Sequence, residues 1–137
     1  MSINDIGKVG ERMARAVLIH DFRVDDIFQP DWMIRIGSKY YVVEVKHKAM
    51  YEAPPFDGQG LDVRQVNARM RFWKDTGIRC IFLVIDMEGN IYVQWLDVLE
   101  KGEHFDTKNG IRVYNLNGFK SRGTYHEKIN SRSTQTA

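Results

Sequence analysis

The spacing of hydrophobic residues divides the first part of the chain into a helix followed by strands. Over residues 5–20 the apolar positions recur every three or four residues, which is typical of a helix with one buried stripe. Segments 23–28 and 32–36 alternate between apolar and polar residues, and Pro30 between them interrupts strand pairing. The pattern therefore predicts one helix and two short strands before residue 37.

Residues 37 and 38 favour a tight turn between two strands. A Gly-Ser pair fits a two-residue turn, because glycine readily adopts the positive φ of the first central position. We therefore expect strand 31–36 to fold back on strand 39–46. The next segment, 47–60, contains two prolines and two glycines without a sustained period, so a surface loop is expected there.

The second half of the chain predicts one more helix and further strands. The expected elements are a helix over 61–77 and strands over 79–86, 90–96 and 111–116. Because the helix must cross over between two strands, the order favours a mixed sheet with helices packed against it. Residues 1–119 are expected to form a single domain, and 120–137 a polar, flexible C-terminal tail.

Length and composition favour one intracellular domain. The chain has 137 residues, of which 43% are hydrophobic, enough for one packed core. No apolar run approaches the roughly 18 to 20 residues of a membrane span, and the N-terminal residues lack the pattern of a secretion signal. The lone Cys80 excludes an internal disulfide and a cysteine-based metal knuckle. We expect a soluble cytoplasmic protein, in the host cytoplasm if the source is viral.

The distribution of charge is more informative than its sum. A net charge of +2 does not by itself predict a nucleic-acid partner. Basic residues nevertheless gather on the helix expected over 61–77, where they could contact a nucleic-acid backbone. The candidates there are Arg64, Arg69, Arg71 and Lys74, with His47 and Lys48 just after strand 39–46.

The hairpin register brings two carboxylates together. With Gly37 and Ser38 as the turn, paired positions sum to 75, so Asp31 lies opposite Glu44. Like charges on opposite rungs are destabilising unless something positive lies between them. A divalent cation between the two carboxylates would turn this repulsion into attraction. Mg²⁺ and Mn²⁺ prefer oxygen ligands such as two carboxylates and the backbone carbonyl of Val45. Lys46 lies on the same face, where an ammonium could act on an attacking water or a phosphoryl oxygen.

The other face of this hairpin is expected to be the core face. It carries only apolar and aromatic residues, namely Trp32, Ile34, Ile36, Tyr41, Val43 and Val45.

Two alternatives to this interpretation of Asp31, Glu44 and Lys46 must be considered. An acid and a lysine two positions apart on a strand are common surface decoration, so Glu44 and Lys46 alone predict little. Asp25 or Asp26 could replace Asp31 if the first strand began earlier. The register and the preceding proline favour Asp31.

The segment QPDWMIRIGSKYYVVEVKHK resembles the PD-(D/E)XK nuclease superfamily, whose signature is Pro-Asp, a hairpin, and then Glu-x-Lys. The matching residues are Pro30, Asp31, Glu44 and Lys46, and the resemblance extends over roughly residues 5–95. It implies a restriction-endonuclease-like α/β fold with an αβββαβ core and a central mixed sheet flanked by helices. Within the superfamily the chain looks most similar to small stand-alone enzymes of the Holliday-junction-resolvase, Mrr-like and virus-type kinds.

The resemblance also implies roles for individual residues. Asp31 and Glu44 would hold Mg²⁺, for which Mn²⁺ can substitute, and Lys46 would act on the nucleophilic water. Glu11 would be a further acid at the metal, and Gln65 would position the lysine, the water or the phosphate. Glu11 could equally form a surface ion pair with Arg15, and a solvated Gln65 is the ordinary alternative.

These expectations describe a metal-dependent nuclease, with DNA favoured over RNA as the substrate and a homodimer suggested by analogy with resolvases. The competing hypothesis is a nucleic-acid-binding module that keeps the nuclease fold without catalysis. No signature residue is missing from this sequence, which favours the enzyme.

Overall fold

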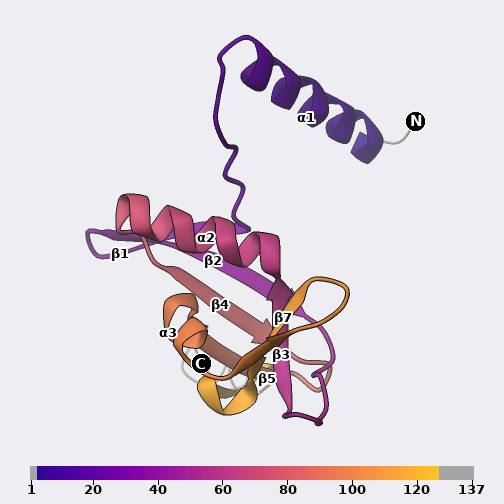
Figure 1. The fold of residues 1–137 in the computed structure, drawn as a ribbon, viewed down its shortest axis with the longest axis vertical. Coiled ribbons are helices and arrows are strands. Elements are labelled where there is room, and N and C mark those ends of the chain that lie inside the picture. The colour runs from indigo at the N-terminus through magenta and orange to yellow at the C-terminus, as the bar shows by residue number, and fades with distance from the viewer. Residues whose placement is uncertain (1–2, 127–137) are drawn as a thin grey trace, which may run out of the picture.

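The computed structural model describes residues 3–126 (Figure 1). Its main sheet has the strand order β1-β2-β4-β5-β8, and a second sheet has the order β3-β7-β6. The strands of the main sheet are β1 (Trp32–Ile36), β2 (Lys39–His47), β4 (Cys80–Ile85), β5 (Asn90–Trp95) and β8 (Lys120–Thr124). Those of the second sheet are β3 (Gly58–Asp62), β6 (His104–Asp106) and β7 (Ile111–Asn115). The helices are α1 (Ile3–His20), α2 (Val63–Thr76), α3 (Leu96–Lys101) and the short 3-10 helix η1 (Leu116–Gly118).

The order α1-β1-β2-β3-α2-β4 agrees with the expected αβββαβ arrangement. β2 and β4 are parallel and the other pairs of the main sheet are antiparallel, so the sheet is mixed. The chain crosses from β2 to β4 through β3 and α2, because parallel neighbours need a long connection. The predicted α/β fold class is confirmed.

The predicted hairpin register is also confirmed. Trp32 pairs with Val43 and Ile36 with Lys39, so paired positions sum to 75. Gly37 has φ of +62°, the left-handed conformation expected of the first turn residue. Asp31 immediately precedes β1 and lies beside the rung of Glu44.

The core lies on one face of the main sheet. Val42, Phe82 and Val84 are fully buried there, in one cluster with side chains from α2, from α3 and from the second sheet. The cluster also includes Leu61, Val66, Cys80, Leu96, Leu99 and Tyr114. In Figure 1, α2, α3 and the second sheet all lie over this face.

The expectation about which face of the hairpin forms the core was wrong. The face expected to be buried leaves Trp32 59% and Ile36 61% exposed, whereas Glu44 on the other face is fully buried. Both faces of β2 are largely apolar, so the position of α2 decides which one is covered. Glu44 can be buried because α2 brings a cation to it, as described below.

Three segments differ from their predicted structure. Residues 23–28 are irregular, because Arg23 takes a positive φ of 54° and Phe28 stacks on Phe72 of α2 instead of pairing in the sheet. The segment expected to be loop until residue 60 contains the start of β3. The segment expected to be a tail from residue 120 supplies edge strand β8, while 127–137 lie outside the described residues.

The glycines that suggested a loop before α2 are required by close strand packing. A Cβ atom at Gly58 would lie 2.2 Å from the carbonyl oxygen of Tyr114, and one at Gly60 would lie 2.6 Å from the side chain of Ile111. Both neighbours belong to β7, which pairs with β3. Here glycine indicates two backbones in close approach and not a loop.

Within residues 3–126 there is no helix that is both long and apolar enough to cross a membrane.

Candidate metal and nucleic-acid site

Two carboxylates meet where β1 begins. Asp31 Oδ2 accepts a hydrogen bond of 2.8 Å from the backbone N–H of Val45, which fixes this carboxylate beside β2. Glu44, one residue earlier on β2, points under α2 and is fully buried. Burial raises the pKa of Glu44, Arg69 lowers it, and the neighbouring Asp31 raises it again. The structure therefore brings Asp31 and Glu44 together, as the register predicted.

Arg69 of α2 is the cation that allows Glu44 to be buried. Its Nε donates a short hydrogen bond to Glu44 Oε1, and its Nη2 donates one of 2.8 Å to the backbone oxygen of Gln29. The guanidinium also lies over the ring of Phe28, 4.6 Å from the ring centroid. Arg69 is only 5% exposed. This geometry differs from the expected solvent-facing contact with nucleic acid, because Arg69 is committed to the carboxylate.

The donor set fits a hard divalent cation. Glu44 Oε2 is buried and has no hydrogen-bond partner among the described residues, although Oε1 is bound to Arg69. An unpaired buried carboxylate oxygen is costly unless a further positive group satisfies it. The described residues include no cluster of three or more histidine, cysteine or acidic side chains, so the acids of such a site would be Asp31 and Glu44. Water or phosphate oxygens would complete the coordination of Mg²⁺.

Lys46 lines a hollow near the start of α2. Two residues after Glu44, it lies on the same face of β2. The hollow is lined by Lys46, Lys48, Asp62, Arg64, Gln65 and Ile111. Burial lowers the pKa of Lys48, and the charge of Lys46 lowers it further. The structure thus brings Lys46 and Gln65 together, as expected, and adds Lys48 and Arg64 to the same hollow.

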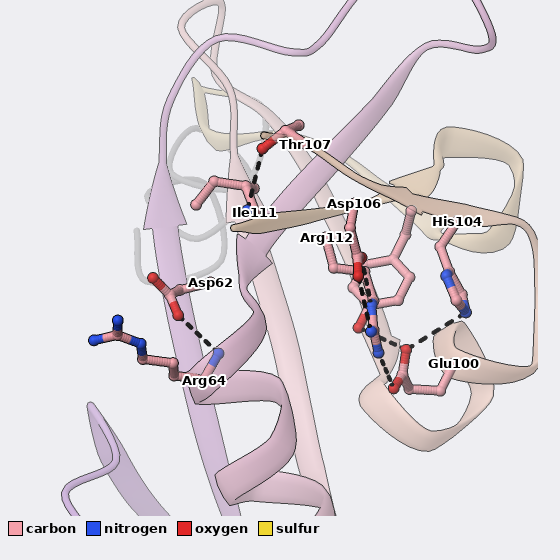
Figure 2. Close-up of polar contacts among 9 residues, drawn as sticks. Asp62, Arg64, Glu100, His104, Asp106, Thr107, Ile111 and Arg112 are labelled. Atoms are coloured by element: carbon pink, nitrogen blue, oxygen red, sulfur yellow. Dashed lines mark hydrogen bonds and ion pairs between the residues drawn. The ribbon is translucent and has the colours of Figure 1, made fainter. Parts of the chain in front are cut away.

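The first turn of α2 is fixed at the edge of this hollow. Asp62 Oδ1 accepts a hydrogen bond of 2.8 Å from the backbone N–H of Arg64 (Figure 2), which is an N-terminal cap. Asp62 is therefore occupied as a cap. The Arg64 side chain is exposed and extends from the capped turn.

The other candidate residues lie further from the carboxylates or point elsewhere. Glu11 is exposed on α1, which stands apart from the sheet in Figure 1, so this structure does not bring it to Asp31 and Glu44. Arg71 and Lys74 are exposed on α2, where Arg71 lines a different hollow with Asp25 and Asp26. His47 is exposed at the end of β2, and its Nδ1 lies 2.9 Å from the carbonyl oxygen of Ile85.

A second polar cluster joins α3 to β6 and β7 (Figure 2). Arg112 bridges Glu100 and Asp106, with nitrogen-to-oxygen distances of 2.8 Å to each. Glu100 also accepts a hydrogen bond of 3.1 Å from the hydroxyl of Tyr114 and lies 3.7 Å from His104. The hydrogen bond from Arg112 lowers the pKa of Asp106. Every charge here has a partner, so the cluster is structural.

Sequence reasoning missed the role of Arg69. Gln65 and Arg69 are four residues apart, so the sequence shows only that they share a face of α2. The sequence does not show how deeply this face is buried, because that depends on which side of the sheet α2 covers. The Arg112 cluster had no local signal, since its members are distant in sequence.

Comparison with known proteins gives a structural similarity but no matching sequence family. No family model matches the chain, and no curated protein matches it. Among solved structures, it is similar to Hjc, a Holliday junction resolvase from the archaeal hyperthermophile Archaeoglobus fulgidus. The TM-score is 0.47 at 13% sequence identity, covering 82% of this chain and 91% of the resolvase chain. This similarity concerns the overall fold alone.

Proposed function

We propose that the protein is a metal-dependent nuclease that hydrolyses phosphodiester bonds, with DNA as the preferred substrate. One observation supports this most strongly. Two carboxylates lie together, one with an unpaired buried oxygen, and Lys46, on the same face of β2 as Glu44, lines a hollow with Lys48 and Arg64. Acidic ligands for a cation next to basic contacts for a phosphate are what phosphodiester hydrolysis requires.

Asp31, Glu44 and the backbone carbonyl of Val45 would hold Mg²⁺ or Mn²⁺, which when bound polarises a phosphate and acidifies a coordinated water. Arg69 lowers the pKa of Glu44 against the larger effect of burial and fixes its orientation through Oε1, leaving Oε2 for the cation. Lys46 lies on the same face and would orient the attacking water or neutralise charge on a phosphoryl oxygen. Gln65 lines the same hollow and would position either group by hydrogen bonding.

Lys48 and Arg64 would bind the phosphates that flank the cleaved bond. Both line the hollow with Lys46, and the only acid there, Asp62, is occupied as the cap of α2. Such contacts depend on charge and not on base sequence, so binding should weaken steeply as salt rises. His47, Arg71 and Lys74 are exposed and could extend this basic surface. A nuclease of this kind would work inside the cell, and it would act on a branched junction most simply as a homodimer.

The test is cleavage of plasmid, single-stranded and branched DNA, and of RNA, with Mg²⁺, Mn²⁺ or EDTA. Glu44→Gln and Lys46→Ala should each lose cleavage. Lys39→Ala is the matched control, because Lys39 is an exposed lysine at the start of the same strand and distant from Glu44. Binding of Mn²⁺, followed by electron paramagnetic resonance, should weaken in Glu44→Gln and persist in Lys46→Ala.

The same experiment separates the enzyme from a non-catalytic binding module. A module would bind DNA without cutting it in any metal, and Lys46→Ala would then change binding alone. Cleavage that persists in both variants, or that EDTA does not abolish, would refute the proposed chemistry.

A further inference from the structure

One face of the main sheet is left uncovered by the described chain. We call it the open face, and its side chains include Trp32, Ile36, Tyr41, Ile81, Leu83 and Val93. Helices α2 and α3 and the second sheet pack on the opposite face, in the cluster around Phe82. Trp32 and Ile36 remain 59% and 61% exposed, Tyr41, Ile81, Leu83 and Val93 are half-buried, and Val43 and Ile91 on the same face are buried. An apolar surface of this extent, with Lys120 and Arg122 of β8 at its edge, is typical of an interaction site.

Helix α1 presents a second uncovered apolar surface. Ile6, Met13 and Val17 fall on one side of the helix and are 57%, 64% and 46% exposed. We call this set the α1 stripe. In Figure 1, α1 stands apart from the sheets, joined to them by an extended segment. An amphipathic helix gains most of its stability by packing its apolar side, so α1 lacks a partner within residues 3–126.

The side of α1 that faces its own chain is the polar one. Arg15 donates a short hydrogen bond to the side chain of Gln29, which ties α1 to the segment leading into β1. Arg15 is two residues after Met13, about 200° around the helix axis, because each residue of an α-helix turns by about 100°. The α1 stripe therefore points away from the body of its own chain.

The connection to α1 is too short for the helix to reach the open face of its own chain. Val24 donates a hydrogen bond of 3.2 Å to Leu18, and Phe28 stacks on Phe72 of α2, 4.0 Å between ring centroids. The four peptide steps between Val24 and Phe28 span at most roughly 14 Å. Layers on opposite faces of a sheet lie about 20 Å apart, since each packs about 10 Å from it. Phe28 is held in the α2 layer, so α1 stays on that side.

We propose that the open face is covered by α1 of a second copy of this chain, and that the exchange is reciprocal. Each copy then supplies one apolar helix and one apolar sheet face. A single two-fold axis relates the two resulting helix-on-sheet contacts, so both apolar surfaces of each copy are covered. An 18-residue helix is about 27 Å long and about 10 Å wide, so two helix-on-sheet contacts bury roughly 1,100 Å² in total, near the lower limit for specific dimers.

The test is the oligomeric state of the full chain without metal or nucleic acid, measured by sedimentation equilibrium over a range of concentrations. The wild-type chain should dimerise. Met13→Glu in the α1 stripe and Ile36→Glu on the open face should each raise the dimer Kd about tenfold or more, because an unpaired charge in an apolar contact is costly. Lys8→Glu adds negative charge to the polar side of α1 and should leave the dimer unchanged. Circular dichroism verifies that each variant is folded.

Mixing the two disrupted variants tests the exchange directly. In a mixed pair, the intact α1 of Ile36→Glu meets the intact open face of Met13→Glu, so one of the two contacts is restored and mixed dimers should form. A chain that remains monomeric overturns the proposal. Sensitivity to Met13→Glu alone would indicate pairing of two α1 helices, sensitivity to Ile36→Glu alone would indicate pairing of two sheets, and either result also overturns it. No outcome depends on nuclease activity.

Discussion

Replacing Arg69 by methionine should uncover the electrostatic cost of burying Glu44. Methionine retains much of the packing volume but removes the hydrogen bonds to Glu44 and Gln29 and the contact with the ring of Phe28. Removing one partner of a buried ion pair costs about 3–5 kcal/mol, because the remaining charge is left uncompensated. Uptake of a proton by Glu44 limits this cost, so we expect a loss of about 3 kcal/mol in the free energy of unfolding. For a chain of this size that lowers Tm by roughly 10 °C.

The pH dependence of this loss has a defined sign. Burial raises the pKa of Glu44 above its ordinary value of 4.5, and Arg69 opposes that rise. Without Arg69 the pKa in the folded state rises further. A carboxyl group with a raised pKa binds its proton more tightly when folded, so its contribution to stability falls as pH increases from about 4.5 through the folded pKa. Arg69→Met should therefore differ least from the wild type at pH 4 and most at pH 7.

Urea unfolding at several pH values measures both effects, and Arg71→Met is the matched control. Arg71 lies two residues further along α2 with its side chain exposed, so its replacement should change stability by less than about 0.5 kcal/mol. Saturating Mg²⁺ should stabilise Arg69→Met more than the wild type, since a bound cation replaces the missing charge beside Glu44. Equal stability of Arg69→Met and Arg71→Met at pH 7 would refute this account of Glu44. So would a loss of stability in Arg69→Met that does not change with pH.

Three further predictions concern local structure and binding. Gly58→Ala should lower the free energy of unfolding in urea by about 2 kcal/mol or more, because its Cβ would lie 2.2 Å from a β7 carbonyl; unchanged stability would contradict the packing of β3 on β7. Asp62→Ala should cost about 1 kcal/mol in the same assay through loss of the α2 cap, while Asp62→Asn should retain most of it. Arg64→Ala should weaken DNA binding and reduce the slope of log K against log salt by about 1, as measured by fluorescence anisotropy; an unchanged slope would remove Arg64 from the phosphate contacts.

The sequence predicted the elements whose signals are local. Helix periodicity located α1 and α2, and the Gly-Ser turn set the register that places Asp31 opposite Glu44. Each of these depends on neighbours a few residues apart. The hairpin, α2 and β4 follow from the same signals, whereas β3 between the hairpin and α2 does not.

The features that were not predicted depend on long-range packing. Alternation along β2 defines two faces but does not say which one α2 covers, so Glu44 was expected to face away from the core. Its burial depends on Arg69, 25 residues later in the chain. β3 was missed because its glycines indicate a loop until β7 is placed beside them. β8 was missed because a short polar edge strand has no apolar periodicity.

The buried thiol of Cys80 supplies a natural reporter of unfolding. Cys80 is 3% exposed, and burial raises its pKa to about 12, so almost none of it is thiolate at neutral pH. Alkylating reagents should therefore modify the folded protein only when β4 becomes accessible. Because Cys80 pairs with Val42 beside Glu44, the labelling rate measures how often the layer around the carboxylates opens, without any added probe.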